Sequence, residues 1–174
     1  MDKVEVDKLT KLYNEQYLKV GLEQELLRAK RFGRELSLLL LAAEIPAKVK
    51  QDMQYRVLKQ LGNFVKMYTR SIDVGVRYGD CVLVILPETP LEGARRAGEK
   101  VKEQIEKHIF VHHDSGYEFN VKVTVKIAVY PHNGGDRAEL LEFLKENEST
   151  QIIEPPPSAG GGEESPAAPV SEKA

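Results

Sequence analysis

The feature that most constrains the fold is a nearly continuous apolar run from Leu36 to Ile45, which Pro46 ends. Ser37 and Glu44 are the polar residues within it. A strand with one solvent-exposed face alternates apolar and polar residues, whereas a strand covered on both faces is apolar almost throughout. The run is also far shorter than the roughly 20 residues that a membrane span needs. The sequence therefore predicts a central strand between two layers of structure.

Other periodic segments predict the elements around this strand. Apolar residues recur at helical spacing in four segments, which predicts helices over residues 14–31, 52–69, 91–107 and 137–146. Residues 74–78 and 81–86 read as two strands that meet at Gly79-Asp80, and a glycine suits so tight a turn. Residues 121–130 alternate between valine or isoleucine and polar residues, including Lys122 and Lys126, which predicts a half-exposed strand. This order of elements indicates an α/β layer fold with a mixed sheet.

Composition limits the classes of protein to consider. The chain has 174 residues, and we expect one domain over residues 1–150. Residues 151–174 are rich in Pro, Gly, Ser and Glu, which predicts a disordered tail, either a plain solvated terminus or a tether. A net charge of −2 argues against a nucleic-acid partner. One cysteine excludes an internal disulfide, and no signal peptide or membrane-inserting segment is recognised, so we expect a cytoplasmic protein.

Four segments, in this order, resemble the GGDEF family of diguanylate cyclases. They are DKLTKLYN (7–14), ELSLLLLAAEI (35–45), RSIDVGVRYGDCVLVILPETPLEGARRAGEKV (70–101) and VKVTVKIAVYP (121–131). The resemblance covers about residues 7–147. It implies a central five-stranded sheet flanked by helices, similar to the palm of nucleotide cyclases. Active members of the family are homodimers that condense two GTP molecules into cyclic di-GMP.

The resemblance also shows where this sequence departs from an active cyclase. The family's metal-binding aspartate after the first strand corresponds to Ala42, and the GGDEF hairpin is reduced to Gly79-Asp80-Cys81. Phosphoryl transfer from GTP needs a divalent cation held by several oxygen ligands, and a neutral thiol is a poor substitute. We therefore expect no enzymatic activity, no catalytic residues, no metal site and no cofactor, with Mg²⁺ relevant only if some GTP binding is retained.

A second site of the family keeps more of its residues in this sequence than the catalytic site does. Arg70-Ser71-Ile72-Asp73 matches the RxxD motif that forms the inhibitory cyclic di-GMP site of the family, and Lys100 stands where the family has a further arginine. Arg96 lies one helical turn earlier and is a further candidate. Arginine can donate a fork of hydrogen bonds to phosphate or guanine, whereas lysine acts as a point charge. The plainer interpretation is that Arg70 and Asp73 form a salt-bridged pair at a helix end.

The remaining polar clusters have simple explanations. His112-His113-Asp114 and Gly134-Gly135-Asp136 read as turns rather than as metal or nucleotide sites. Cys81 reads as a small apolar residue rather than a redox switch. The usual last helix of the family is absent, which leaves a sheet edge that could be open for docking.

These observations favour a catalytically inactive GGDEF-like signalling domain that binds cyclic di-GMP at its RxxD motif or binds a protein partner. Two alternatives remain at this point. One is a pure protein-interaction scaffold that binds no nucleotide. The other is a weak cyclase or GTP-binding protein that uses Asp80 with Glu44. Cyclic di-GMP binding that is lost in Arg70→Ala would exclude the scaffold alternative. GTP turnover with Mg²⁺ would support the cyclase alternative.

Overall fold

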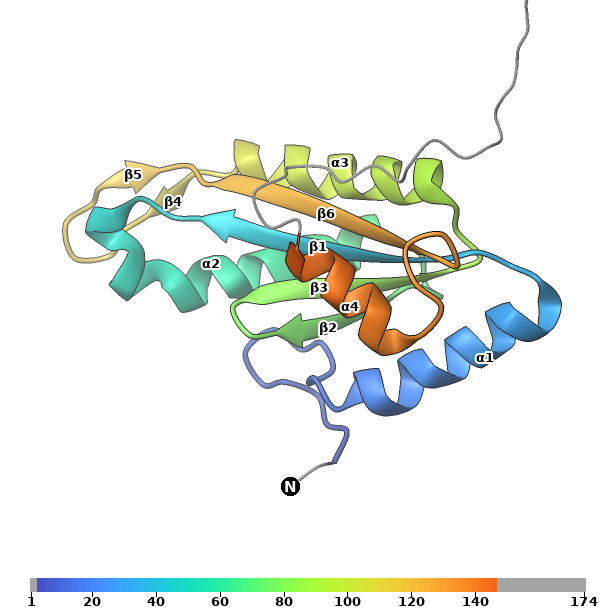
Figure 1. Ribbon diagram of the computed structural model, residues 1–174. Helices are drawn as coiled ribbons and strands as arrows, with labels where there is room; N and C mark the ends of the chain where they lie inside the picture. Colours follow the sequence, from blue (N-terminus) through green and yellow to red (C-terminus); the bar gives the residue numbers. More distant parts are fainter. Residues whose placement is uncertain (1–2, 147–174) are drawn as a thin grey trace, which may run out of the picture.

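The apolar run forms β1 (Leu36–Glu44), and it lies inside a four-stranded sheet with the order β2-β3-β1-β6. The computed structural model describes residues 3–146 (Figure 1). β1 pairs with β3 (Cys81–Pro87) on one side and with β6 (Lys122–Tyr130) on the other. Strands on both edges and helices on both faces explain why β1 carries almost no polar side chain.

All pairs in this sheet are antiparallel, which corrects the prediction of a mixed sheet. α2 (Ala47–Tyr68) carries the chain from β1 to β2 (Val74–Tyr78), and β3 inserts between these two strands. α3 (Leu91–Lys107) likewise carries the chain from β3 past β1 to β6. Each helical crossover skips one strand position, so strands of the same direction never become neighbours. This β-α-β-β-α-β arrangement is ferredoxin-like.

The predicted α/β class, with a central sheet flanked by helices, is confirmed, but the strand count differs. The main sheet has four strands among the described residues, where the family resemblance implied five. On the edge formed by β2, Tyr13 makes a single parallel bridge to Val76, which is too short to count as a strand. The boundary expected near residue 150 and the tail expected from residue 151 lie outside the described residues.

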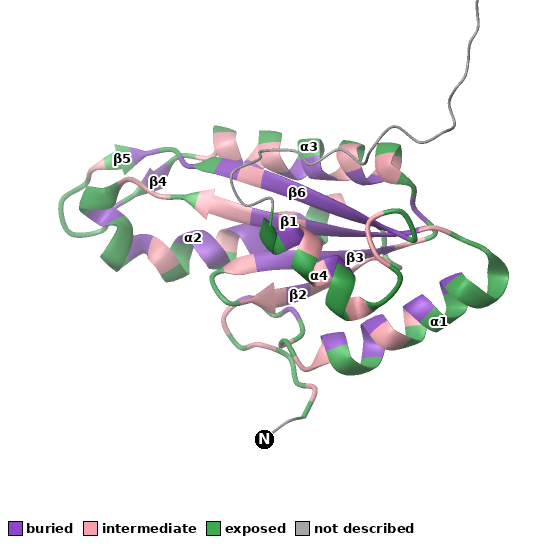
Figure 2. Ribbon diagram, viewed as in Figure 1, coloured by how far each residue is buried: buried purple, intermediate pink, exposed green. Residues whose placement is uncertain are grey.

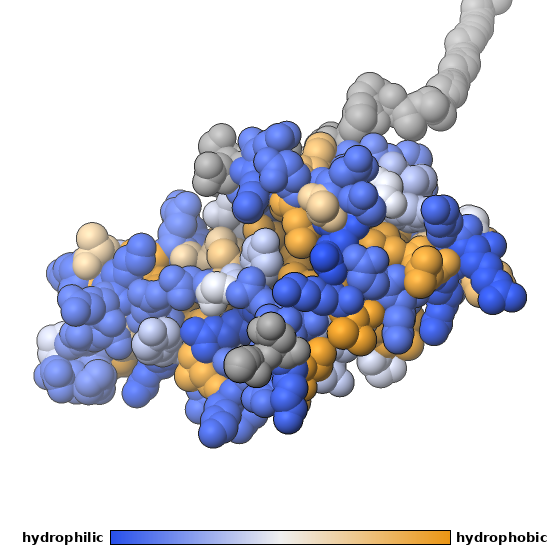
Figure 3. Space-filling model, turned by 60° about the horizontal axis from the view of Figure 1, so that its bottom comes forward, coloured by the Kyte–Doolittle hydropathy of each residue, from blue (hydrophilic) through white to orange (hydrophobic). Residues whose placement is uncertain are grey.

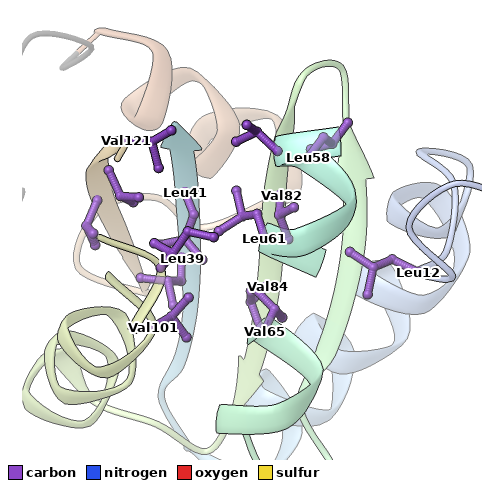
Figure 4. Close-up of a cluster of buried hydrophobic side chains, with 14 of the residues drawn as sticks. Leu12, Leu39, Leu41, Leu58, Leu61, Val65, Val82, Val84, Val101 and Val121 are labelled. Carbon is purple, nitrogen blue, oxygen red and sulfur yellow. The ribbon is translucent and has the colours of Figure 1, made fainter. Parts of the chain in front are cut away.

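The first face of the sheet is covered by α2 and α3. Their inward side chains meet those of the strands in a cluster drawn in Figure 4, in which Leu39, Leu61 and Val101 are fully buried. Gly98 brings α3 close to the strands: a Cβ at this position would lie 2.9 Å from Leu39 Cδ1 and 2.8 Å from Val125 Cγ1. Close packing at this point depends on the absence of a side chain.

The second face is covered by α1 (Glu23–Phe32) and α4 (Arg137–Glu146). β6 was predicted to be half-exposed, but this layer buries most of its length (Figure 2). The side chain of Lys126 is buried with the rest, and its Nζ donates to the carbonyl oxygen of Leu144, 3.4 Å away. A helix C-terminus is a favourable partner for a cation. The alternation of polar residues was therefore misleading, because α4 supplies a partner for the lysine.

The helix predictions differ from the structure mainly at their beginnings. α3 and α4 have the predicted bounds. The helix expected over 14–31 is a π-helical segment (Leu18–Leu22) followed by α1. α2 begins at Ala47, five residues earlier than predicted, because the helix starts directly after Pro46 and buries Val49 in its first turn. A short hairpin, β4 (Phe110–Val111) with β5 (Glu118–Phe119), was not predicted.

The turn at Gly134-Gly135-Asp136 is the N-terminal cap of α4. The backbone N–H of Glu139 donates to Asp136 Oδ1 at 2.8 Å, and the backbone N–H of Gly135 donates to Glu139 Oε1 at 2.8 Å. This pattern is similar to a capping box, except that Glu139 accepts from Gly135, the residue before the N-cap Asp136. The segment thus has a structural role, as expected from the sequence.

The surface around α1 is mostly hydrophilic, with hydrophobic side chains in separate patches (Figure 3). Leu27, Phe32 and Val20 are the exposed apolar residues of this region. Among the described residues, no helix is both long enough and apolar enough to cross a membrane.

Candidate functional site

The Gly79-Asp80 turn joins β2 to β3 directly. Tyr78 pairs with Cys81, so the turn contains two residues, and Gly79 has a φ of +64°. Glycine adopts this left-handed conformation without the strain that a side chain would bring. Gly79 therefore allows a two-residue turn to close the hairpin.

Ala42, Asp80 and Cys81, three of the positions that the resemblance aligns with the family's catalytic site, line one small pocket. Its volume is about 120 Å³, and its other lining residues are Ala43, Ile45, Lys50, Gln54, Val57, Leu58 and Leu61. Among the residues that the structure describes, Asp80 is the single carboxylate in this lining, and Glu44 does not contribute to it. Small-molecule sites typically have volumes of about 300–1,000 Å³. Within residues 3–146, no group of three or more His, Cys, Asp or Glu side chains could hold a metal ion.

Cys81 has the properties of a packed thiol. Burial raises its pKa, the neighbouring Asp80 carboxylate raises it further, and the positive charge of Lys126 partly opposes both. A thiol with a raised pKa stays protonated near neutral pH, and the thiolate is the form that reacts and binds metal. The sequence interpretation of Cys81 as a small apolar residue agrees with this environment.

A polar latch that the sequence analysis missed holds the N-terminal loop on this hairpin. Arg77 Nη1 donates to Asp7 Oδ1 at 3.0 Å, and Arg77 Nε donates to the carbonyl oxygen of Gly79 at 3.2 Å. The backbone N–H and hydroxyl of Thr10 both donate to Asp7 Oδ2 at 2.8 Å. The DxLT pattern alone contained the signal, because an aspartate three residues before a threonine commonly closes such a loop.

The pKa of Asp7 makes this latch sensitive to acid. Burial acts to raise it, but hydrogen bonds from Thr10 and Arg77 outweigh burial and lower it. The carboxylate therefore stabilises the fold above about pH 4, and this stabilisation is lost as pH falls through the lower folded-state pKa. We expect Asp7→Asn to reduce the free energy of unfolding by about 2 kcal/mol at neutral pH, and to reduce its acid dependence. Urea unfolding at neutral and acid pH measures both, with the exposed Asp80→Asn as control; equal losses in both variants would contradict the latch.

Arg70 and Asp73 form a tight turn after α2. Arg70 donates from Nη2 to Asp73 Oδ1 at 2.9 Å and from Nε to Asp73 Oδ2 at 3.2 Å, and its backbone N–H also donates to Oδ2 at 2.8 Å. Nη2 further contacts Thr89 Oγ1 at 2.7 Å and the carbonyl oxygen of Pro87 at 3.1 Å. The Asp73 side chain is 2% exposed and that of Arg70 is 52% exposed. The turn is thus rigid, with its guanidinium half open to solvent.

The four residues predicted for ligand binding line one hollow of about 530 Å³. Arg70 and Asp73 form one wall, and Arg96 and Lys100 of α3 form another. Tyr68 was not predicted from the sequence, and its ring centroid lies 5.7 Å from Lys100 Nζ in a cation–π contact. Glu88 and Thr89 were not predicted either, and the remaining lining residues are Met67, Thr69, Leu86, Pro90, Gly93 and Ala97. The hollow therefore combines three cations, an aromatic ring and two acids.

The histidine cluster is a turn, as the sequence analysis expected. His112 lies in the loop that connects β4 to β5, and its side chain is buried. Its Nε2 lies 2.9 Å from Asp52 Oδ2 on α2. Its Nδ1 lies 2.8 Å from Ser115 Oγ. His113 contacts its neighbour Asp114 at 3.6 Å on the exposed surface. These contacts fasten the hairpin to α2.

Comparison with protein families now identifies the fold. The family described as "Diguanylate cyclase, GGDEF domain" matches residues 4–147. The chain belongs to the GGDEF family. The four segments noted in the sequence are thus part of one continuous match. That match also includes the region around Ala42 and Gly79.

The sequence identities between this chain and individual relatives are low. The chain is 26% identical over 145 residues to the response regulator PleD of Caulobacter vibrioides, a match that covers 80% of this chain and 32% of PleD. The chain thus spans about a third of the length of this relative. A GGDEF-only structure of PA1120 (TpbB or YfiN) from Pseudomonas aeruginosa has a TM-score of 0.73 at 19% identity, covering 85% of this chain and 92% of that chain. DgcB from Caulobacter crescentus, solved in complex with c-di-GMP, has a TM-score of 0.71 at 15% identity, covering 81% and 76%.

Proposed function

We propose that this chain is a GGDEF domain that has lost diguanylate cyclase activity and binds cyclic di-GMP in the hollow around Arg70 and Asp73. The observation that carries the proposal is the contrast between two sites on one molecule. The pocket at Ala42 and Asp80 is small and has one carboxylate, whereas the hollow is more than four times larger and contains all four candidate ligand-binding residues.

The presence of one carboxylate where a metal site needs several oxygen ligands supports the loss of catalysis. A divalent cation of the Mg²⁺ type needs several oxygen ligands, and triphosphate binding needs that charge. Asp80 is exposed and is the one acid that lines the pocket. Ala42 cannot coordinate a cation, and the protonated thiol of Cys81 is a poor ligand for a hard one.

The chemistry of the hollow supports a ligand with both phosphates and purine rings. Arg70 Nη1 makes no hydrogen bond within residues 3–146, so it retains donors for a guanine or phosphate oxygen. Arg96 and Lys100 are exposed and place two more positive charges on the facing helix. The Tyr68 ring supplies an aromatic surface. DgcB is a relative of this fold that was solved with c-di-GMP, which makes that dinucleotide the first ligand to test.

One observation favours the alternative of a protein-interaction scaffold. Asp73 already receives three hydrogen bonds from Arg70, and its side chain is almost completely buried. A purely structural role would explain this pair without any nucleotide. Under this alternative, cyclic di-GMP would not bind, and the fold would serve a protein partner.

Turnover tests the catalytic half of the proposal. We expect the full chain to form no cyclic di-GMP when it is incubated with GTP and Mg²⁺ and the products are separated by chromatography. Product formation that disappears in Asp80→Ala would contradict the proposal and support the weak-cyclase alternative. In the same preparation, cyclic di-GMP is expected to be retained in equilibrium dialysis, which the scaffold alternative does not predict.

A further inference from the structure

A third hollow shares no lining residue with the two sites discussed above. It has a volume of about 760 Å³ and lies between α2, the N-terminal loop and the chain from the end of α3 into β4. α2 and β4 are neighbours at one end of the molecule in Figure 1. We call this hollow the α2–β4 groove, and its lining residues are Leu9, Tyr55, Arg56, Lys59, Gln60, Asn63, His108, Ile109, Phe110 and Val111.

The charges of the α2–β4 groove all have one sign. Arg56 and Lys59 are exposed on α2, and neither forms an ion pair within residues 3–146. Among residues 3–146, no aspartate or glutamate lines the groove. The hollow around Arg70 differs in this respect, because Asp73 and Glu88 offset its cations. An acidic partner would therefore be attracted more strongly to the α2–β4 groove than to the hollow around Arg70.

The groove also exposes apolar and aromatic surface. Tyr55 is 61% exposed, Ile109 57% and Val111 44%. Beneath this surface, the buried ring of Phe110 and the half-buried ring of His108 stack edge to face, with ring centroids 4.6 Å apart. Aromatic-lined grooves of this kind bind proline-rich segments, because proline offers a flat apolar surface and loses little conformational entropy on binding.

We propose that the C-terminal segment of the same chain, residues 147–174, binds in the α2–β4 groove. This segment has five glutamates and one lysine, a net charge of −4, which complements Arg56 and Lys59. It also contains Ile152-Ile153-Glu154 followed directly by Pro155-Pro156-Pro157. The isoleucines and prolines match the apolar and aromatic surface, and Glu154 is the carboxylate adjacent to them.

Reach and local concentration both permit this contact. The 28 residues after Glu146 can span at most roughly 90 Å, which exceeds the diameter of a domain whose radius of gyration is about 15 Å. Joining a segment to its site gives an effective concentration of about 1 mM. A segment that binds as a separate peptide with a Kd of about 100 μM would therefore occupy its groove about nine-tenths of the time.

Paramagnetic relaxation in the full chain locates the segment directly. A spin label on Ser158→Cys, in a Cys81→Ser background, is expected to broaden the backbone amide signals of residues 55–63 and 108–111. The double variant Arg56→Glu/Lys59→Glu is expected to reduce that broadening at least about fivefold. The matched control is Lys19→Glu/Lys30→Glu, which makes the same charge change at exposed lysines before and within α1 and should leave the broadening unchanged.

Three outcomes would overturn the proposal. The first is broadening that is absent from the groove or uniform over the surface. The second is an equal loss in both double variants, which would indicate a general charge effect. The third is undiminished broadening when Pro155, Pro156 and Pro157 are replaced by glycine together with Glu154→Gln. Broadening seen in unlabelled chains mixed with spin-labelled ones would assign the segment to a neighbouring molecule, which also contradicts binding within one chain.

Discussion

Replacing Arg70 by alanine is expected to weaken cyclic di-GMP binding by at least about 30-fold. Hydrogen bonds to charged groups contribute about 1.5–3 kcal/mol each, and 2 kcal/mol corresponds to roughly a 30-fold change in Kd. The variant would also leave the buried Asp73 carboxylate without its main partner. Calorimetric titration of the unchanged chain and of Arg70→Ala with cyclic di-GMP measures the change in affinity.

Because Arg70→Ala can also disturb the turn, Arg96→Ala provides the cleaner comparison. Arg96 lines the same hollow, is exposed, and forms no ion pair within residues 3–146. We expect roughly a tenfold loss of affinity with no change in the melting temperature. Lys30→Ala removes the same charge from an exposed site on α1 and should change neither quantity. Unchanged affinity in both Arg70→Ala and Arg96→Ala would show that the ligand binds elsewhere.

Replacing Leu39 by alanine is expected to lower the free energy of unfolding by about 3 kcal/mol, which is a large share of the stability of a domain this size. Leu39 is fully buried, and it contacts α3 where Gly98 allows close approach (Figure 4). The cavity left by the smaller side chain adds to the lost hydrophobic transfer energy. Urea unfolding followed by circular dichroism gives the value.

The matched control for this variant is Leu27→Ala on α1. Leu27 is 66% exposed, so the same chemical change should alter the free energy of unfolding by no more than about 0.5 kcal/mol. Similar losses at both positions would mean that β1 is not the centre of the core. A large loss at Leu27 alone would indicate that the exposed side of α1 is covered in solution.

The sequence predicted the strands and the later helices well, for a physical reason. Leu36 to Leu41 is buried or nearly so on both faces, so its pattern has one interpretation, and the turn at Gly79 needs a residue that tolerates positive φ. α3 and α4 have clear amphipathic periods and are bounded by Pro90 and the Asp136 cap. In each case the local pattern and the tertiary environment favour the same structure.

The missed features depend on contacts between distant segments. The antiparallel sheet follows from crossovers that skip a strand, which no local pattern records. Lys126 looked solvent-exposed because its partner, the carbonyl oxygen of Leu144, lies on another element. The β4–β5 hairpin has only two residues in each strand, and its attachment through His112 to Asp52 joins residues 60 positions apart.

The candidate site was predicted in its residues but not in its shape. The family resemblance indicated Arg70, Asp73 and Lys100, and helical spacing added Arg96. Neither could show that Tyr68 lies beneath Lys100, or that Arg70 already binds Asp73 and Thr89. These contacts bear most directly on whether a ligand binds, because they determine which donors remain available.

The most direct test of the central claim is calorimetry of the full chain with two ligands in parallel. We expect saturable heat on titration with cyclic di-GMP and none on titration with GTP and Mg²⁺. Such a result would describe a receptor that keeps the fold of a cyclase without its catalytic site. Heat with GTP and Mg²⁺, or no heat with cyclic di-GMP up to about 1 mM, where binding energy falls to roughly 4 kcal/mol, would contradict it.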